Sequence, residues 1–174
     1  MEITLGIGTN LGDRTENIRL AIQLLAPTVT VTRVSSVYET EPWGYADQPS
    51  FYNVAVTGKT ELDPRSLLSF VKSIERRMKR AETFRNGPRV IDIDILYYEK
   101  DQFRTESLTI PHPQIAKRRF VLEPLLELFP DGSDPITQIP FRALLAAAPR
   151  SGVTRLDLSL SLEKPVFRFG VKTY

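Results

Sequence analysis

Hydrophobic residues between Glu2 and Tyr98 recur with two spacings. A spacing of two, which places alternate side chains on one face of a strand, favours strands over residues 2–8, 28–38, 51–60 and 89–98. Spacings of three and four predict helices with one apolar face at Ile18, Ala21, Ile22 and Leu25, and at Leu67, Phe70, Val71, Ile74, Met78 and Ala81. The helices and strands therefore alternate as β-α-β-β-α-β.

Polar residues mark the ends of these elements. Asp13, followed three residues later by Glu16, has the capping-box pattern of a helix start, and Pro27 ends that helix. Asp63 and Pro64 open the second helix as cap and first-turn residue. Residues 40–50 and 83–88 are rich in turn-forming residues and are predicted loops, and a further apolar helix is expected over residues 120–128.

This element order predicts an α+β fold of the ferredoxin-like kind, an antiparallel sheet with two helices on one face. Ferredoxin-like folds include enzymes, metal chaperones and RNA-binding modules, so the fold alone does not give the function.

The composition is that of an ordinary globular domain, with 174 residues, 41% of them hydrophobic and 25% charged. The absence of cysteine excludes disulfides, thiolate zinc sites and cysteine nucleophiles. No segment approaches the roughly 18 to 20 apolar residues that cross a bilayer, and nothing after Met1 resembles a secretory signal. We therefore expect a cytoplasmic protein that binds no membrane.

Basic residues are concentrated in one part of the chain. The net charge of +2 is too small to favour nucleic-acid binding. Between Lys72 and Arg89, however, the acidic Glu75 and Glu82 face seven basic residues, Lys72, Arg76, Arg77, Lys79, Arg80, Arg85 and Arg89. This segment is either a solvated helix face or a site for a polyanion such as a nucleotide triphosphate.

Asp92 and Asp94 stand two residues apart in the predicted strand 89–98, so they share one face while Ile91, Ile93 and Ile95 share the other. Two neighbouring carboxylates repel each other unless a cation compensates them. Carboxylate oxygens with phosphate and water suit Mg²⁺. The same pattern also fits the charged outer face of an edge strand, so the pair alone leaves both readings open.

The loop before this strand adds arginine to the carboxylates. Arg85 lies in the loop and Arg89 follows Gly87-Pro88. These arginines would lie beside a metal site at the carboxylates, and phosphoryl transfer needs such groups to position the phosphates and neutralise their charge. No G-x-x-x-x-G-K-[ST] run occurs, so a P-loop is excluded. His112, the only histidine, lies between two prolines. It is either a structural residue or a functional one whose side chain the stiff backbone holds in a fixed orientation.

Several motifs together resemble the 6-hydroxymethyl-7,8-dihydropterin pyrophosphokinase family of folate biosynthesis. In chain order they are residues 6–12 (GIGTNLG), 35–42 (SSVYETEP), 47–53 (DQPSFYN), 74–75 (IE), 87–94 (GPRVIDID), 111–113 (PHP) and 118–122 (RRFVL). They cover about residues 1–130, so we expect a single domain, 1–174, with a core of about 1–130 and a C-terminal extension of about 131–174.

The resemblance implies that ATP gives a pyrophosphoryl group to the hydroxymethyl oxygen of the pterin and leaves as AMP. It implies that Asp92 and Asp94 bind two Mg²⁺ ions, and that Arg80 and Arg89 stabilise the transferring group. The residues implied around ATP are Lys72, Glu75, Arg85, Thr109, His112 and Arg118. Those implied around the pterin are Thr40, Trp43, Phe51, Asn53 and Phe120, with the two phenylalanines stacking on its ring.

The C-terminal part fits the resemblance least. Alternating leucines from Leu156 to Leu162, and the run Val166–Phe169 after Pro165, predict a strand pair or hairpin. We expect this segment to extend the sheet or to form a subunit contact, so the chain is a monomer, or a dimer through this segment.

Two other classes of function stay open. A non-enzymatic ferredoxin-like module, either an RNA-recognition domain or a small-ligand sensor, would explain the fold but not the acid pair, the basic loop and His112 together. An RNA-recognition domain should also carry exposed aromatics in its central strands, and no such run is present. A metal-dependent phosphohydrolase or nucleotidyltransferase would explain the carboxylates but not the Phe51, Asn53 and Phe120 set.

Overall fold

An antiparallel six-stranded sheet forms the centre of the computed structural model, which describes residues 1–42, 44–80, 84, 87–158 and 160. Its strands are β1 (Glu2–Thr9), β2 (Val29–Val34), β3 (Tyr38–Thr40), β4 (Phe51–Thr60), β5 (Asp92–Tyr98) and β8 (Val153–Arg155). They lie in the order β5-β1-β4-β3-β8, and β2 also pairs with β4. The short strands β6 (Phe103–Arg104) and β7 (Thr109–Ile110) form a separate pair.

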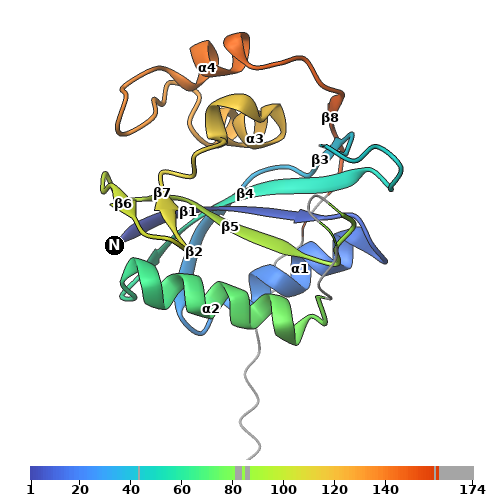
Figure 1. The fold of residues 1–174 in the computed structure, drawn as a ribbon, viewed down its shortest axis with the longest axis horizontal. Helices are drawn as coiled ribbons and strands as arrows, with labels where there is room; N and C mark the ends of the chain where they lie inside the picture. The colour runs from blue at the N-terminus through green and yellow to red at the C-terminus, as the bar shows by residue number, and fades with distance from the viewer. Residues whose placement is uncertain (43, 81–83, 85–86, 159, 161–174) are drawn as a thin grey trace, which may run out of the picture.

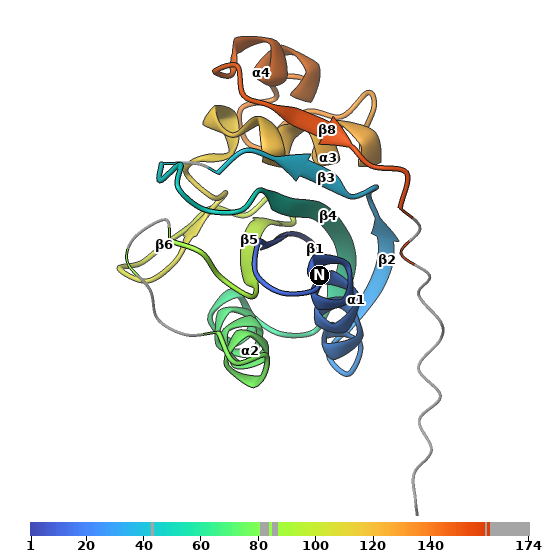
Figure 2. The same ribbon diagram turned by 90° about the vertical axis from the view of Figure 1, so that its right-hand side faces the viewer.

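Helices cover both faces of this sheet, as Figures 1 and 2 show. On one face lie α1 (Arg14–Leu25) and α2 (Pro64–Arg77), the two helices that the sequence predicts on a common face. On the other face lie α3 (Arg119–Leu128) and α4 (Phe141–Ala147), with the short 3₁₀ helix η1 (Ile115–Lys117) before α3. Within the described ranges, no helix has both the length and the apolarity needed to cross a bilayer.

The predicted caps start both helices of the first layer. The Asp13 carboxylate accepts from the Glu16 backbone N–H at 2.9 Å, and the Asp63 carboxylate accepts from the N–H groups of Arg65 and Ser66. The Glu16 carboxylate accepts from Arg19 one turn later, an interaction that the capping-box pattern does not predict.

Two predicted strands differ in extent from the observed ones. The predicted strand 28–38 is split, because the Ser36 backbone N–H is bound by the Glu127 carboxylate of α3, and β2 and β3 pair with successive parts of β4. The predicted strand 89–98 starts only at Asp92, because the Arg89 N–H and carbonyl both bind Asn10. Up to Leu128, the other predicted strands and helices are observed at nearly the expected positions, although α2 ends at Arg77 and Ala81, predicted on its apolar face, lies outside the described residues.

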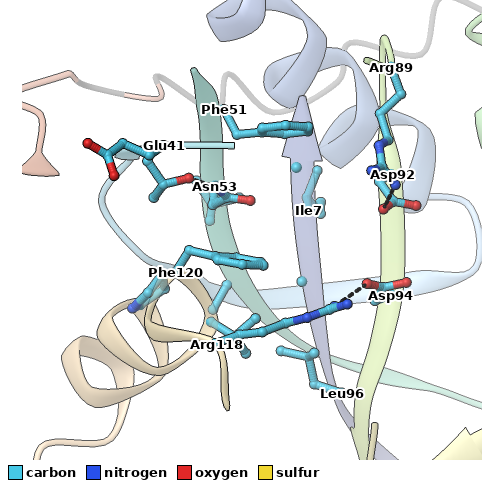
Figure 3. A pocket seen from close by; sticks show the side chains of 17 residues that line it. Ile7, Glu41, Phe51, Asn53, Arg89, Asp92, Asp94, Leu96, Arg118 and Phe120 are labelled. Carbon is cyan, nitrogen blue, oxygen red and sulfur yellow. Dashed lines mark hydrogen bonds and ion pairs between the residues drawn. The ribbon is translucent and has the colours of Figure 1, made fainter. Parts of the chain in front are cut away.

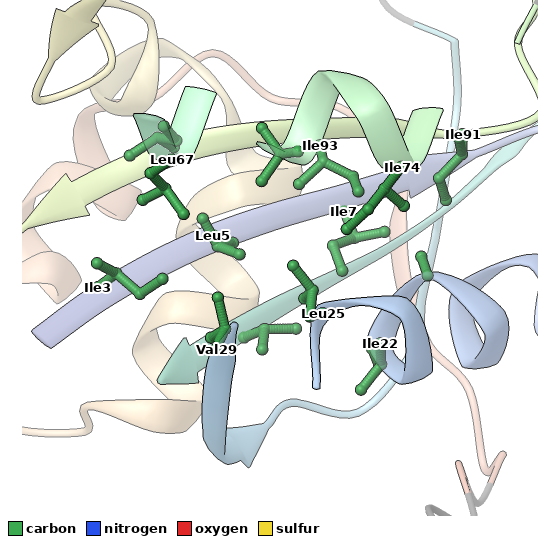
Figure 4. Close-up of a cluster of buried hydrophobic side chains, with 14 of the residues drawn as sticks. Ile3, Leu5, Ile7, Ile22, Leu25, Val29, Leu67, Ile74, Ile91 and Ile93 are labelled. Carbon is green, nitrogen blue, oxygen red and sulfur yellow. The ribbon is translucent and has the colours of Figure 1, made fainter. Parts of the chain in front are cut away.

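Each face of the sheet has its own apolar core. Between the sheet and α1 and α2, side chains such as Leu5, Leu25 and Leu67 are fully buried (Figure 4). Ile91, Ile93 and Ile95 join this core, so Asp92 and Asp94 face the α3 side, as the alternation predicts. The second core, under α3 and α4, is smaller and includes Leu96, Tyr97, Leu122, Leu125 and Phe141.

The C-terminal part adds helix α4 and strand β8, and β8 joins the sheet beside β3 (Figure 2). β8 ends at Arg155, so the strand predicted from Leu156 is wrong for residues 156–158 and 160; the rest of that run lies outside the described residues. The second half of the predicted hairpin, residues 166–169, lies outside the described residues.

Candidate active site

A cavity opens on the α3 side of the sheet, where five elements meet (Figure 3). Gly6 and Gly8 of β1 form its floor, because they leave room that side chains would fill. The walls and roof come from β3 and the residue after it, β4, β5, α3 and the segments before β5 and α3, through Thr40, Glu41, Phe51, Asn53, Val54, Ala55, Arg89, Asp92, Asp94, Leu96, Arg118, Phe120, Val121 and Pro124.

Two aromatic rings face this cavity from opposite sides. Figure 3 shows Phe51 of β4 and Phe120 of α3 with Asn53 between them. The buried Asn53 amide donates to Thr40 Oγ1 at 2.7 Å, which fixes its orientation and leaves a second N–H and the carbonyl oxygen for a ligand. A flat heterocycle with polar edges fits a slot of this kind. Of the residues predicted around the pterin, these four come together, and Trp43 lies outside the described residues.

Asp92 is already paired with two arginines. Its carboxylate accepts from Arg80 Nη1 at 2.7 Å and from Arg89 Nη1 at 2.8 Å. Burial by itself raises the pKa of Asp92, but the positive charges of Arg80 and Arg89 outweigh burial and lower that pKa. Asp92 therefore stays ionised.

Asp94 has a different environment. Its carboxylate lies 3.9 Å from Arg118 Nη1 and 4.0 Å from His112 Nε2, both beyond hydrogen-bond length. Burial and the neighbouring Asp92 carboxylate raise the pKa of Asp94, because its charge is not compensated at close range. A cation between the two carboxylates would remove this repulsion.

Asp94 also forms the wall that the first cavity shares with a second one. The second cavity lies beside α2 and β7, and its lining includes three of the residues predicted around ATP, Lys72, Thr109 and His112. Arg118, a fourth, lines the first cavity, and Arg85 lies outside the described residues. The two carboxylates of β5 thus stand between a slot for a ring and a polar cavity.

Glu75 links helix α2 to strand β5 underneath the two aspartates, through buried hydrogen bonds and ion pairs. It is 4% exposed, and its carboxylate accepts from Lys72 Nζ at 2.7 Å, from Arg80 Nη1 at 2.6 Å and from the Ile93 backbone N–H at 2.8 Å. Glu75 is not one of the described residues that line the two cavities. Since Ile93 lies between Asp92 and Asp94, Glu75 sets the position of both carboxylates.

Two arginines that line the first cavity have an unused guanidinium donor. Among the described residues, Arg89 and Arg118 each have a buried Nε without a hydrogen-bond partner. Their guanidinium carbons lie 5.5 Å from the Phe51 ring and 5.6 Å from the Phe120 ring. A buried unpaired donor is costly, and arginine pairs well with phosphate oxygens, so both side chains are suited to an anionic ligand.

The His112 ring presents an N–H group toward the wall that the two cavities share. Its Nδ1 accepts from the Gln114 backbone N–H at 3.2 Å, so the ring proton is on Nε2, which faces Asp94. Burial and the Arg118 charge lower the pKa of His112 to about 4. The ring is therefore neutral near pH 7.

The donor set at β5 fits Mg²⁺. Hard carboxylate oxygens at Asp92 and Asp94 share one face of a strand, and Asp94 is short of positive partners. Within the described part of the chain, no group of three or more histidine or acidic residues could hold a metal by itself. Mg²⁺ commonly binds one or two carboxylates and takes its remaining ligands from phosphates and water, which suits this arrangement.

Several residues of the site had no predicted role. Gly6, Gly8 and Asn10 belong to the first family-like motif and Glu41 to the second, but no local pattern indicated what they do. Asn10 is 2% exposed and joins two loops, because its Nδ2 donates to Gln48 Oε1 and the Pro49 carbonyl while its Oδ1 accepts from the Arg89 N–H at 2.8 Å.

We expect the substitution Asn10→Ala to lower the free energy of unfolding by about 2 kcal/mol, because it leaves the Arg89 N–H and the Pro49 carbonyl without their partner. Urea denaturation measures this change. The matched control is Gln102→Ala at an exposed position, which should leave the midpoint unchanged. An Asn10→Ala midpoint equal to that of the control would contradict the role of Asn10.

Known proteins resemble this chain over most of its length. Residues 4–130 match the model of the 7,8-dihydro-6-hydroxymethylpterin-pyrophosphokinase (HPPK) family. A Bacillus subtilis protein named 2-amino-4-hydroxy-6-hydroxymethyldihydropteridine pyrophosphokinase is 46% identical over 126 residues, 71% of this chain and 75% of the relative. A protein of the same name from Aquifex aeolicus is 41% identical over 140 residues, 80% of this chain and 88% of the relative.

Some relatives are much longer. The folic acid synthesis protein FOL1 of Dictyostelium discoideum is 43% identical over 150 residues, which are 86% of this chain but 23% of the relative. Among solved structures, Plasmodium falciparum HPPK-DHPS with pteroate superposes with a TM-score of 0.69 at 19% identity, over 84% of this chain and 42% of that one. At this identity, the structural match supports the fold alone.

Proposed function

Because the chain belongs to the 7,8-dihydro-6-hydroxymethylpterin-pyrophosphokinase family, we propose that its cavities carry out that reaction, the transfer of a pyrophosphoryl group from ATP to 6-hydroxymethyl-7,8-dihydropterin. The family and the enzyme class predicted from the motifs, a pyrophosphokinase of folate biosynthesis, are confirmed by these matches. What the proposal adds is the assignment of each substrate and each side chain to a place in this chain.

The observation that carries the assignment is the position of Asp94 in the wall between the two cavities. We place the pterin in the slot between Phe51 and Phe120, with its polar edge at Asn53 and Thr40. The nucleotide takes the cavity lined by Lys72, Thr109 and His112, with its phosphates toward Asp94. The hydroxymethyl group and the phosphate chain then meet at the shared wall.

Asp92 and Asp94 would hold two Mg²⁺ ions, which supply charge neutralisation and orientation of the triphosphate when bound. The protein's own part is to place the pterin hydroxymethyl oxygen in line with the β-phosphorus, so that the new O–P bond forms as the bond to AMP breaks. Arg80 and Arg89 would stabilise the negative charge of the group in transfer. Glu75 keeps Arg80 and β5 in position.

His112 and Arg118 complete the anion site. The neutral His112 ring offers its Nε2 proton to a phosphate oxygen, and Arg118 has an Nε donor to offer as well. Arg85 and Trp43, predicted beside the nucleotide and the pterin, stay predictions because they lie outside the described residues.

Four further assignments belong with this proposal. The strand order β5-β1-β4-β2 with α1 and α2 on one face supports the ferredoxin-like classification. The division into a core of about 1–130 and an extension of about 131–174 follows the end of the family match at residue 130. The cytoplasmic location and the monomer, or a dimer through the C-terminal segment, stay predictions.

The test is to mix the protein with ATP, Mg²⁺ and 6-hydroxymethyl-7,8-dihydropterin and to measure AMP. We expect AMP to form only when the pterin is present. ADP or inorganic phosphate as the product would instead indicate a phosphotransferase or a phosphohydrolase, and the absence of pterin-dependent AMP would refute the proposal.

The two floor glycines provide a matched pair of variants for the pterin slot. A Cβ atom at Gly8 would lie 2.8 Å from Asn53 Oδ1, whereas one at Gly6 would meet the Leu96 side chain at 3.4 Å. We therefore expect Gly8→Ala to displace the Asn53 amide and to raise the KM for the pterin about tenfold, the effect of about one lost hydrogen bond. Gly6→Ala adds a methyl group to the same floor but leaves the Asn53 amide in place, so it should raise this KM less. Equal KM values for the two variants in steady-state assays would contradict the role of Asn53.

A further inference from the structure

Strand β8 is bound to the sheet through the strand that carries one wall of the pterin slot. In the β3–β8 pair, Val153 lies opposite Thr40 and Arg155 lies opposite Tyr38. Backbone hydrogen bonds extend beyond both ends of this pairing, from the Glu41 N–H to the Gly152 carbonyl at 3.2 Å and from the Leu156 N–H to the Val37 carbonyl at 2.8 Å. The whole of β3 is therefore enclosed between β4 and β8 (Figure 2).

The enclosed strand is short and carries groups of the slot. β3 spans three residues, and its last residue, Thr40, is 3% exposed and accepts the hydrogen bond that orients the Asn53 amide. Glu41, which follows it, also lines the cavity. A three-residue strand has few backbone bonds to one neighbour, so a second neighbour contributes a large share of what holds Thr40 in place.

β8 also contacts α3, the helix on the opposite side of the slot, through Arg155. Arg155 Nε donates to Ser36 Oγ at 2.9 Å, and the same arginine lies 3.8 Å from the Glu127 carboxylate of α3. Glu127 in turn accepts from the Tyr38 hydroxyl at 2.7 Å and from the Ser36 N–H at 2.9 Å. This cluster joins β8, β3 and α3, and α3 is the helix that carries Phe120.

We propose that β8, which lies beyond the family match of residues 4–130, is a positioning element that holds the pterin slot in its binding geometry. The identity of the ligand rests on the proposed function, but the role of β8 concerns affinity for the ring and not the chemical step. Without the β8 pairing, Thr40 and Asn53 would become ordered only when the pterin binds, and the free energy of this ordering would weaken its binding. The nucleotide cavity, lined by α2, β5 and the segment 106–113, would be unaffected.

A proline at Thr154 tests this role in the full chain. The Leu156 N–H points to β3, and since N–H directions alternate along a strand, the Thr154 N–H points to β3 as well. Thr154→Pro removes that donor at an exposed side chain, and Thr154→Ala keeps the donor and serves as the matched control. Calorimetry measures the Kd of 6-hydroxymethyl-7,8-dihydropterin in the presence of a nonhydrolysable ATP analogue, and separately the Kd of the analogue.

We expect Thr154→Pro to raise the pterin Kd about fivefold, the effect of about one lost hydrogen bond, while the analogue Kd changes less than about twofold. Thr154→Ala should match the parent in both. An unchanged pterin Kd in the proline variant would overturn the role of β8, and so would equal weakening in the alanine variant.

A proline variant that circular dichroism finds unfolded would move the test to Arg155→Ala, which removes the contacts with Ser36 and Glu127. An unchanged pterin Kd in a folded Arg155→Ala variant would then refute the proposal, and a raised one would support it. A parent protein that does not bind the pterin at all would refute the proposed function, and this failure is seen before any variant is made.

Discussion

Asp94→Asn is expected to lower the rate of pterin-dependent AMP formation about 10³-fold, because it removes a carboxylate from the wall between the two cavities. A bound metal ion stabilises several kcal/mol of developing charge, and each 1.4 kcal/mol corresponds to about tenfold in rate. The amide has nearly the same shape as the carboxylate, so the substrates should still fit. Steady-state kinetics at saturating ATP and pterin measure the effect.

The same substitution should leave the protein at least as stable as the parent. A carboxyl group with a raised pKa in the folded state destabilises the fold at pH values above that pKa, and its penalty disappears as the pH falls below the ordinary value. Asp94 is in this situation because of burial and Asp92, since its nearest cation, Arg118, lies at 3.9 Å and the His112 ring at 4.0 Å is neutral near pH 7. We therefore expect the melting temperature of Asp94→Asn at pH 7 to equal or exceed that of the parent.

Magnesium provides a measurement that does not depend on turnover. A cation that binds the folded state raises the melting temperature by mass action, so Mg²⁺ with an ATP analogue should stabilise the parent more than the variant. The exposed Asp101→Asn serves as the control and should retain both the activity and the response to Mg²⁺. A rate for Asp94→Asn within about threefold of the control would exclude Asp94 as a metal ligand, since even second-shell changes at metal sites cost more.

Asp92 would give a less direct answer. Its carboxylate accepts hydrogen bonds from both Arg80 and Arg89, so Asp92→Asn would also weaken the hold on two partly buried guanidinium groups. A loss of activity there would combine a lost metal ligand with displaced arginines. The contrast between the two aspartates is itself informative, because one is held by the protein and the other is left for a ligand.

Local periodicity predicted the parts of the fold that depend on local chemistry. The alternation of Ile91, Ile93 and Ile95 with Asp92 and Asp94 predicted that the carboxylates share the face opposite the isoleucines, and in the structure that face borders the cavity. Capping by Asp13 and Asp63 likewise depends on residues two or three positions away. Such features are encoded over a few residues and can be read from them.

What the sequence did not reveal depends on partners far along the chain. The run 28–38 is rich in β-branched residues, and its break at Ser36 depends on Glu127, 91 residues later. The role of Asn10 depends on Arg89, 79 residues later, and the position of β8 depends on β3. No spacing rule relates such pairs, because they meet only after the sheet and α3 have packed.

Glu75 shows the same limit at the level of a single side chain. Its place on a basic helix predicts a surface residue or a nucleotide contact. In the structure its carboxylate is buried and is bound by Lys72, Arg80 and the Ile93 N–H. The resemblance implied a place around ATP for Glu75, and this stays a prediction, since Glu75 is not among the described residues that line the two cavities. The structure indicates that it acts by orienting β5, which the residue type alone could not indicate.

Arg89→Lys should separate the charge of Arg89 from its shape. Asn10 fixes the backbone at Arg89, and Nη1 pairs with Asp92, so a lysine there keeps a positive charge near the carboxylate. It lacks the fork of donors, including the buried Nε that has no partner among the described residues. If that donor binds the group in transfer, kcat should fall about 10²-fold, the effect of one lost transition-state hydrogen bond.

The pattern of kinetic constants decides what Arg89 contributes. A donor used mainly in the transition state lowers kcat with little change in the KM for ATP, whereas a donor that only binds the ground state raises KM and leaves kcat unchanged. The control is Arg142→Lys, where the arginine is exposed and pairs with an exposed Asp131, and its kinetics should match those of the parent. Both variants keep the positive charge. A kcat for Arg89→Lys equal to that of the control would therefore mean that charge alone suffices at this position. The planar guanidinium beside Phe51 would then contribute to the pterin slot and not to the transfer step.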